Sequence, residues 1–134
     1  MITVYRVSDT PVSMTTLTWA VRVLILHATA VAILGVWTTW VAITSDSVSV
    51  TSAVATPLII FFFAAVFGGL AYALHRLRSW ARGPAIVMEL LLIPIGLGAI
   101  GGVPEIGIAI ALTGLAGAAL LLAPSTRGAL GLDR

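Results

Sequence analysis

The sequence predicts an all-α membrane protein: a bundle of four transmembrane helices with both termini in the cytoplasm. Three observations lead to this fold class. First, 60% of the 134 residues are hydrophobic and only 9% are charged, whereas soluble domains contain about 25% charged residues. Second, four apolar stretches are each long enough to cross the hydrocarbon core of a bilayer. Third, every arginine falls on one side of the membrane when these stretches alternate in direction.

The composition also excludes several classes of function. The chain has no cysteine, which excludes disulfides, thiolate metal sites and thiol chemistry. It carries no phosphate-binding loop, no zinc-ligand pattern and no nucleophile elbow. We therefore expect a protein that is not an enzyme, holds no metal or cofactor, and binds lipid rather than nucleic acid.

The first membrane helix is expected at residues 17–43, after a cytoplasmic tail at residues 1–16 in which Met14 offers an alternative start. Trp19 and Trp40 are 21 residues apart, or about 31 Å along a helix, which would place one indole ring at each membrane interface. A cleaved signal peptide is disfavoured because the apolar stretch is much longer than the usual 7 to 15 or so residues.

The second membrane helix is expected at residues 57–74. Residues 44–56 are rich in serine and threonine and would form a flexible outer loop. Thr56 would then cap the helix, with Pro57 at the first helical position, where a backbone donor has no partner in any case. Tyr72 would mark the inner interface.

The third and fourth membrane helices are expected at residues 84–100 and 106–123, with a tight outer turn between them. The third is the weakest span because Glu89 and Pro94 lie within it. We expect it to insert together with the fourth helix as a hairpin. Residues 124–134 would form a short cytoplasmic tail.

The distribution of charge gives the orientation. Under this assignment one side of the membrane holds Arg6, Arg22, Arg76, Arg78, Arg82, Arg127 and Arg134. The other side holds only Asp46 and Glu105. The positive-inside rule therefore predicts a multi-pass protein of the cell membrane with cytoplasmic termini. Arg76, Arg78 and Arg82, between the second and third helices, are expected to contact anionic lipid head groups.

Glu89 and Arg22 are the first candidates for an intramembrane site, because ionisable groups are costly in lipid and often functional. By helical rise, each would lie about 7.5 Å inside the cytoplasmic face. The favoured expectation is a structural ion pair between them that fixes how the two hairpins pack. Two alternatives stay open: each side chain could extend separately to the head groups, or Glu89 could form a proton or cation site.

His27 and Pro94 are the other candidates near the membrane midplane. His27 is expected to be neutral and hydrogen-bonded within the bundle, with a proton relay alongside Glu89 as the alternative. Haem is disfavoured because His75 belongs at the membrane edge, too far away for a second axial ligand. Pro94 removes the backbone bond to Leu90 and is expected to bend or break the third helix; an ion site at the break is the alternative.

Small residues recur at helical spacing and predict close contact between helices. They are Gly107, Ala111, Gly114 and Ala118 on the fourth helix, and the pairs Gly98 and Gly102, Ala64 and Gly68, and Ala65 and Gly69. The same stripes would serve packing within one chain, or contact with a partner or a second copy.

Two segments carry a resemblance to a known group of proteins. Residues 78–85 read RSWARGPA and residues 123–127 read APSTR. Over residues 57–130 the chain resembles small four-helix integral membrane proteins of unassigned function from high-GC bacteria. The resemblance implies the same topology and implies no activity.

The leading functional hypothesis is a non-enzymatic protein that acts by contact, as an accessory or assembly subunit of a larger membrane complex or as a homo-oligomer. It rests on the small-residue stripes and on the lack of a catalytic motif. The alternative is a small oligomeric transporter or channel that uses Glu89 and His27.

Overall fold

The computed structural model describes residues 11–132, and over this range it contains helices and no strands. This confirms the predicted all-α class. Four of the helices are long and apolar enough to cross a membrane. The elements are α1 (Pro11–Thr44), α2 (Val50–His75), the short 3-10 helix η2 (Ser79–Ala81), α3 (Arg82–Ala99), α4 (Pro104–Leu122) and α5 (Pro124–Ala129).

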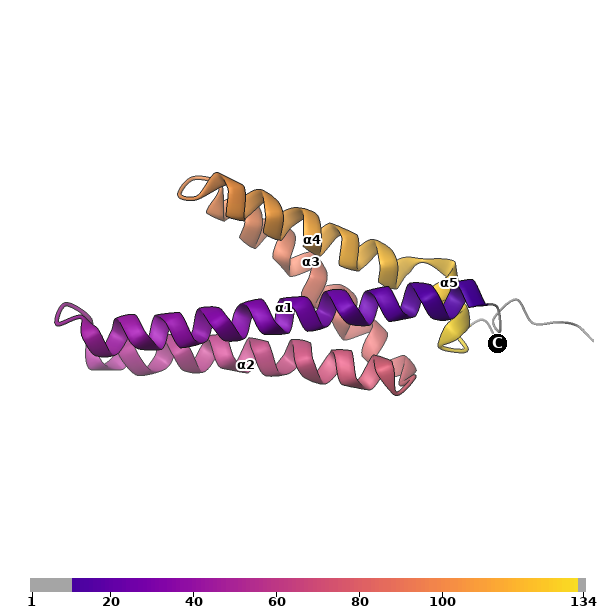
Figure 1. Ribbon diagram of the computed structural model, residues 1–134, viewed down its shortest axis with the longest axis horizontal. Coiled ribbons are helices and arrows are strands. Elements are labelled where there is room, and N and C mark those ends of the chain that lie inside the picture. Colours follow the sequence, from indigo (N-terminus) through magenta and orange to yellow (C-terminus); the bar gives the residue numbers. More distant parts are fainter. Residues whose placement is uncertain (1–10, 133–134) are drawn as a thin grey trace, which may run out of the picture.

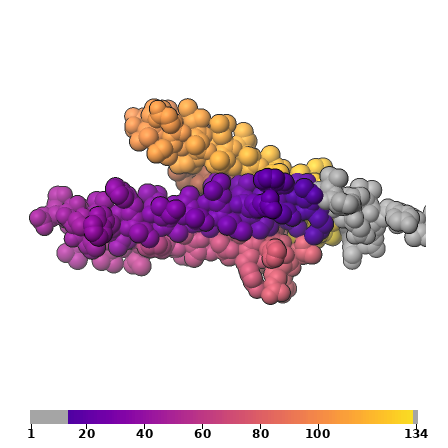
Figure 2. Space-filling view, in the orientation of Figure 1, coloured from indigo at the N-terminus to yellow at the C-terminus, as the bar shows by residue number. Residues whose placement is uncertain are grey.

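The long helices form two antiparallel hairpins, α1/α2 and α3/α4, arranged as a V (Figure 1). The hairpins meet at the end that carries the connector 76–81 and α5, which we call the basic end. They diverge toward the turns at 45–49 and 100–103, which we call the far end. Figure 2 shows the same separation with all atoms drawn, as α4 rises away from α1. Helix contacts are dense within each hairpin and sparse between the two.

The two hairpins differ in length. α1 has 34 residues and α2 has 26, which correspond to about 51 and 39 Å of helix. α3 has 18 residues and α4 has 19, or about 27 and 29 Å. The second hairpin therefore matches a hydrocarbon core of about 30 Å, whereas the first exceeds it.

The helix α1 begins earlier than the sequence predicted. It starts at Pro11, so residues 11–16 are helical and do not belong to a loose tail; the predicted tail at residues 1–10 lies outside the described range. The helix accommodates its threonines because their hydroxyl groups can bond carbonyl oxygens of the preceding turn. Thr18, for example, donates to the Met14 carbonyl oxygen at 2.8 Å.

The helix α2 also begins earlier than predicted. Its N-cap is Ser49, whose hydroxyl oxygen accepts a hydrogen bond from the Ser52 backbone nitrogen at 3.3 Å. This cap satisfies one of the free donors of the first turn and allows the residues at 50–56 to be helical. The expected loop is therefore shorter, and Pro57 lies buried inside the helix instead of at its start.

The connector between the hairpins is a tight C-terminal cap. The Arg78 backbone nitrogen donates to the Ala73 carbonyl oxygen, and the Leu77 nitrogen donates to that of Leu74, both at 2.9 Å. This is the Schellman pattern, in which one residue takes a left-handed conformation that glycine adopts most easily. Here that residue is Leu77, with φ of 57°. Helix η2 then leads directly into α3, which begins two residues before the predicted start at Pro84.

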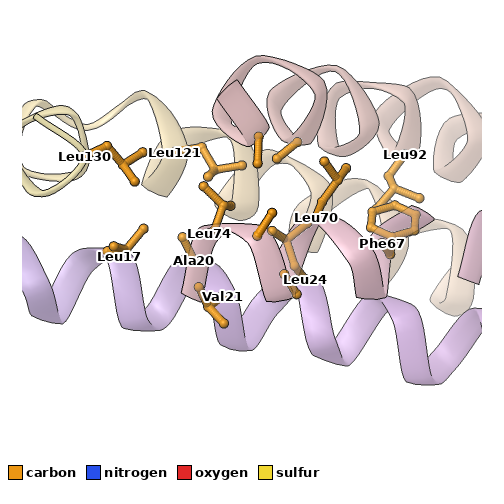
Figure 3. Close-up of a cluster of buried hydrophobic side chains, with 14 residues drawn as sticks. Leu17, Ala20, Val21, Leu24, Phe67, Leu70, Leu74, Leu92, Leu121 and Leu130 are labelled. Carbon is orange, nitrogen blue, oxygen red and sulfur yellow. The ribbon is translucent and has the colours of Figure 1, made fainter. Parts of the chain in front are cut away.

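The buried apolar cluster lies in the half of the molecule nearer the basic end (Figure 3). On α1 its members extend from Leu17 to Leu24, and on α2 from Phe67 to Leu74. The second hairpin contributes Leu92 and Leu121, among others. The hairpins are thus held together at one end by apolar side chains from both.

The residues after α4 are not a simple tail. Residues 124–129 form α5, and Leu130 joins the buried cluster with 8% of its surface exposed. The Ser125 hydroxyl donates to the Thr16 hydroxyl at 2.9 Å, which fastens α5 to α1. Thr126 is fully buried and donates to the Leu120 carbonyl oxygen at 2.6 Å. The segment therefore closes the basic end of the V.

Candidate functional site

The structure brings together two of the predicted site residues, His27 on α1 and Glu89 on α3. His27 Nδ1 lies 3.0 Å from Glu89 Oε1. The histidine side chain is 10% exposed and the glutamate side chain is 0% exposed. His27 is therefore hydrogen-bonded within the bundle, as expected, and its partner joins the first hairpin to the second.

The predicted ion pair between Arg22 and Glu89 is wrong. Arg22 is exposed, and its guanidinium lies over the Trp19 ring, 5.1 Å from the centroid. The reason is rotation around the helix axis. Arg22 and His27 are five residues apart, which turns them about 140° from each other at 3.6 residues per turn. The predicted depths also favoured the wrong residue, because they placed Arg22 level with Glu89 and His27 nearer the midplane, whereas the packing brings His27 to Glu89.

Helical spacing explains how the pair is held. His27 follows Leu24 by three residues and so lies on the same buried face of α1. On α3 the buried positions are Ala85, Glu89, Leu92 and Gly96, which form one stripe. The aromatic ring of Phe67, on α2, lies 5.6 Å from the imidazole ring. Glu89 is buried because it lies on the stripe of α3 that packs against the other helices.

Glycines on α4 make room for the acid. A Cβ atom added at Gly117 would overlap Oε2 and the carboxyl carbon of Glu89. A Cβ atom at Gly114 would lie 2.8 Å from the Glu89 carbonyl oxygen and 2.7 Å from the Leu92 Cβ. Sequence reasoning included Gly114 in its stripe but missed Gly117, although three-residue spacing from Gly114 was a usable signal.

Two polar atoms of the pair have no hydrogen-bond partner: His27 Nε2 and Glu89 Oε2, both buried. Such atoms are uncommon in folded proteins and often mark a functional group. Among the described residues no three histidine, cysteine, aspartate or glutamate side chains gather as metal ligands. The chemistry that the pair itself can perform is the binding and release of a proton.

Pro94 does not break α3. The helix continues through it to Ala99, and Pro94 is exposed on its surface. The expected break of the helix at this residue is therefore wrong, whereas the expected bend stays a prediction. One missing backbone bond, to Leu90, is tolerated within a helix whose other face packs closely against α4.

The α3/α4 contact confirms one of the predicted stripes. Gly107 and Gly114 are buried on α4, and Ala111 contacts Gly96 on α3. A Cβ atom at Gly96 would lie 2.5 Å from the Gly107 carbonyl oxygen, so the two backbones touch. The other predicted stripes make no such contact: an added Cβ atom would meet nothing within 4 Å at Gly69 or Gly98, and only atoms at 4.0 and 3.9 Å at Gly68 and Gly102.

The predicted lipid-contacting arginines differ from one another in the structure. Arg76 and Arg78 line an open groove of about 600 Å³ together with Tyr72 and Trp80. Arg76 Nε donates to the Tyr72 hydroxyl at 3.2 Å. Arg82 instead donates from Nε to the Leu121 carbonyl oxygen at 2.8 Å, so it ties the start of α3 to the end of α4.

No protein-family model, curated protein or solved structure matches this chain. Inference about its function therefore starts from three features of the described residues. They are the buried pair at His27 and Glu89, the V formed by the two hairpins, and the arginine-lined groove at the basic end.

Proposed function

We propose that this chain is a multi-pass protein of the cell membrane that acts by contact, as an accessory or assembly subunit. Four apolar helices fit a membrane location. The confinement of arginine to one side supports cytoplasmic termini. The partner in this proposal is another membrane protein or a second copy of the chain.

The observation that carries the proposal is the V. The two hairpins share a core only near the basic end, and no more than 28% of any spanning window is buried within the chain. Large apolar side chains are exposed along the far halves of all four helices, including Ile33, Leu34, Phe62, Ile95, Leu97, Ile106 and Ile108. In lipid, helices associate by close packing, and a partner helix between the hairpins would supply the packing that the single chain lacks.

Purification in a mild detergent tests the proposal. We expect the protein to run as an assembly larger than one chain, and native mass spectrometry would give the subunits. A photoreactive residue at Ile33 or Ile95 should cross-link to the partner, whereas one at the exposed Leu77, at the basic end, should not. A monomer without cross-links from the far halves would contradict the proposal.

The orientation has its own test, made simple by the absence of cysteine. A cysteine at Ser47, in the far-end turn, should react with an impermeant reagent on intact cells. A cysteine at Ser79, in the connector, should react only after the membrane is permeabilised. The reverse pattern would contradict cytoplasmic termini.

We also propose that the groove at the basic end holds an anionic phospholipid head group. Arg76 and Arg78 supply positive charge, worth about 1 kcal/mol each near a membrane surface, and Trp80 is an interfacial residue. Retention of phosphatidylglycerol in native mass spectrometry should fall when both arginines are changed to glutamine. The matched control is Arg22→Gln, outside the groove, which should retain the lipid.

A second candidate function is a small oligomeric transporter or channel, favoured by the buried pair of His27 and Glu89. Ionisable groups inside a membrane commonly mark proton or ion pathways. Liposomes that contain the protein should then show a proton or cation flux that Glu89→Gln abolishes. A flux that is unchanged in this variant would remove transport through the pair.

A further inference from the structure

We propose that His27 and Glu89 form an intramembrane proton-binding site, whose occupancy controls how firmly the α1/α2 hairpin is joined to the α3/α4 hairpin. The inference rests on neither proposed function, because a proton can bind whether or not the protein assembles with a partner or transports an ion.

The contact between the two side chains requires one shared hydrogen. His27 Nδ1 and Glu89 Oε1 are 3.0 Å apart, and both carry a lone pair in that direction when neither is protonated. Two facing lone pairs repel, so one hydrogen must lie between the two atoms. This first proton is a structural part of the contact.

The net charge of the pair depends on a second hydrogen, on His27 Nε2. With one further proton, on Nε2, the pair is neutral, either as imidazolium with carboxylate or as imidazole with carboxylic acid. Loss of the Nε2 proton leaves neutral imidazole donating from Nδ1 to a carboxylate, with a net charge of −1. The Nε2 proton is therefore the exchangeable one, because it can leave without breaking the contact between Nδ1 and Oε1.

The surroundings of the pair are mostly apolar. Against it, α2 places Phe67, and α4 places Gly114 and Gly117. On α1, Arg22 is exposed over an indole ring, and on α3 the half-buried Arg82, two turns before Glu89, donates to the Leu121 carbonyl oxygen. The side chains of Tyr72 and His75 on α2, Arg76 in the connector and Glu105 on α4 are exposed. After loss of the Nε2 proton, the ion-pair partner of the fully buried Glu89 is a neutral imidazole, and a buried carboxylate with a neutral partner is costly in a low-dielectric site.

The pair lies beside the buried apolar cluster that joins the hairpins. His27 comes one turn after Leu24, which is the last α1 residue of the buried cluster, and Phe67 is the first α2 residue of that cluster. On α3 the cluster extends one turn beyond Glu89, to Leu92. The pair thus lies near the limit of the shared core, where the hairpins begin to diverge. Water can reach the deprotonated pair only if the hairpins part at this point. Proton release should therefore loosen the junction, and proton binding should close it.

The test for the junction is a distance measurement between the far-end turns. Spin labels on cysteines at Ser47 and Gly101, in the full-length protein in lipid nanodiscs, would report the separation by pulsed electron resonance. We expect the distances to become longer as the pH is raised across the range in which the protein stays folded. Glu89→Gln should abolish this response, and Glu105→Gln, at an exposed acid in the first turn of α4, should leave it intact. Distances that do not change with pH in the parent, or that change equally in Glu89→Gln, would overturn the coupling.

Proton binding has an independent readout that does not need a variant of the pair. The chain has two histidines, so His75→Gln leaves His27 as the single imidazole for nitrogen-15 magnetic resonance. We expect Nε2 to lose its hydrogen as the pH rises, while one hydrogen stays between Nδ1 and Glu89 Oε1. If Nε2 keeps its hydrogen over the whole range in which the protein stays folded, the site does not exchange a proton and the inference fails.

Discussion

Both hairpins consist of apolar helices, but they pack in different ways. In α1/α2 the tight contact at a glycine is between a side chain and the backbone: a Cβ atom at Gly35 would lie 2.9 Å from the Phe61 ring. In α3/α4 the approach is between backbones, because a Cβ atom at Gly107 would lie 2.6 Å from the Gly96 carbonyl oxygen and 2.8 Å from the Ile100 nitrogen. A ring can rotate away from an added atom, whereas a helix backbone cannot. The contact at Gly35 should therefore tolerate an added methyl group, whereas the contact at Gly107 should not.

This difference also determines where the acid is held. The close backbones of α3 and α4 leave space beside Gly117 for the Glu89 carboxylate, and α1 then supplies the histidine. The second hairpin thus encloses the Glu89 carboxylate, and the first hairpin supplies its hydrogen-bond partner, His27. Four substitutions test this comparison, ordered from the largest expected loss of stability to an expected gain.

Removal of the histidine should have the largest effect. His27→Ala leaves the fully buried Glu89 without its partner, and breaking one side of a buried pair costs about 3 to 5 kcal/mol. Unfolding equilibria in mixed micelles would measure this loss. His75→Ala is the matched control, because His75 is exposed at the end of α2 and should change stability little. Equal losses in the two variants would show that the pair does not join the hairpins.

A methyl group in the backbone contact should come next. Gly96→Ala places its Cβ against the Gly107 carbonyl oxygen and the Ala111 nitrogen, and we expect a loss of about 1 to 3 kcal/mol from overpacking. Gly98→Ala is two residues away, meets nothing within 4 Å, and should gain up to about 1 kcal/mol from helix propensity. The same unfolding measurement would separate them. Similar values for both would contradict close packing of α3 on α4.

The matching change in the first hairpin should be much milder. In Gly35→Ala the Phe61 ring must move, which costs about 1 kcal/mol, but alanine regains a similar amount through its higher helix propensity. The net change in unfolding free energy should therefore be close to zero. A loss as large as that of Gly96→Ala would mean that α1/α2 is as intolerant as α3/α4.

A glycine substitution in the connector between the hairpins should raise stability instead of lowering it. Leu77 has a left-handed backbone, which costs about 1 to 2 kcal/mol for a residue with a Cβ atom. Leu77→Gly should remove most of this cost, and the greater freedom of glycine in the unfolded chain should offset part of the gain. We expect a net stabilisation of about 1 kcal/mol in the same assay. A destabilised variant would show that the exposed leucine side chain makes contacts worth more than the backbone strain.

The number and order of the spans could be predicted because hydropathy is read along the chain, and each apolar stretch did become a helix. The boundaries were harder. The serine and threonine residues at 50–56 resemble a loop in composition, yet the Ser49 cap allows them to be helical. The partner of Glu89 could not be predicted from depth, for two reasons. Helical rise placed Glu89 level with Arg22 and His27 deeper, whereas His27 and Glu89 are in contact. Depth also gives no direction around the helix. The V could not be predicted either, since it depends on where side chains from two hairpins interlock.

The unequal lengths of the hairpins have a consequence for the surrounding bilayer. A bilayer whose hydrocarbon thickness matches the roughly 27 to 29 Å helices of α3/α4 is thinner than the length of the α1/α2 helices, roughly 39 to 51 Å. When the shorter pair lies at its natural depth, the longer pair must tilt, the lipid beside it must thicken, or its serine- and threonine-rich ends at 11–16 and 50–56 must project into the head groups. Membrane thickness thus acts mechanically on the opening of the V, so the same chain should hold a different shape in thin and in thick membranes.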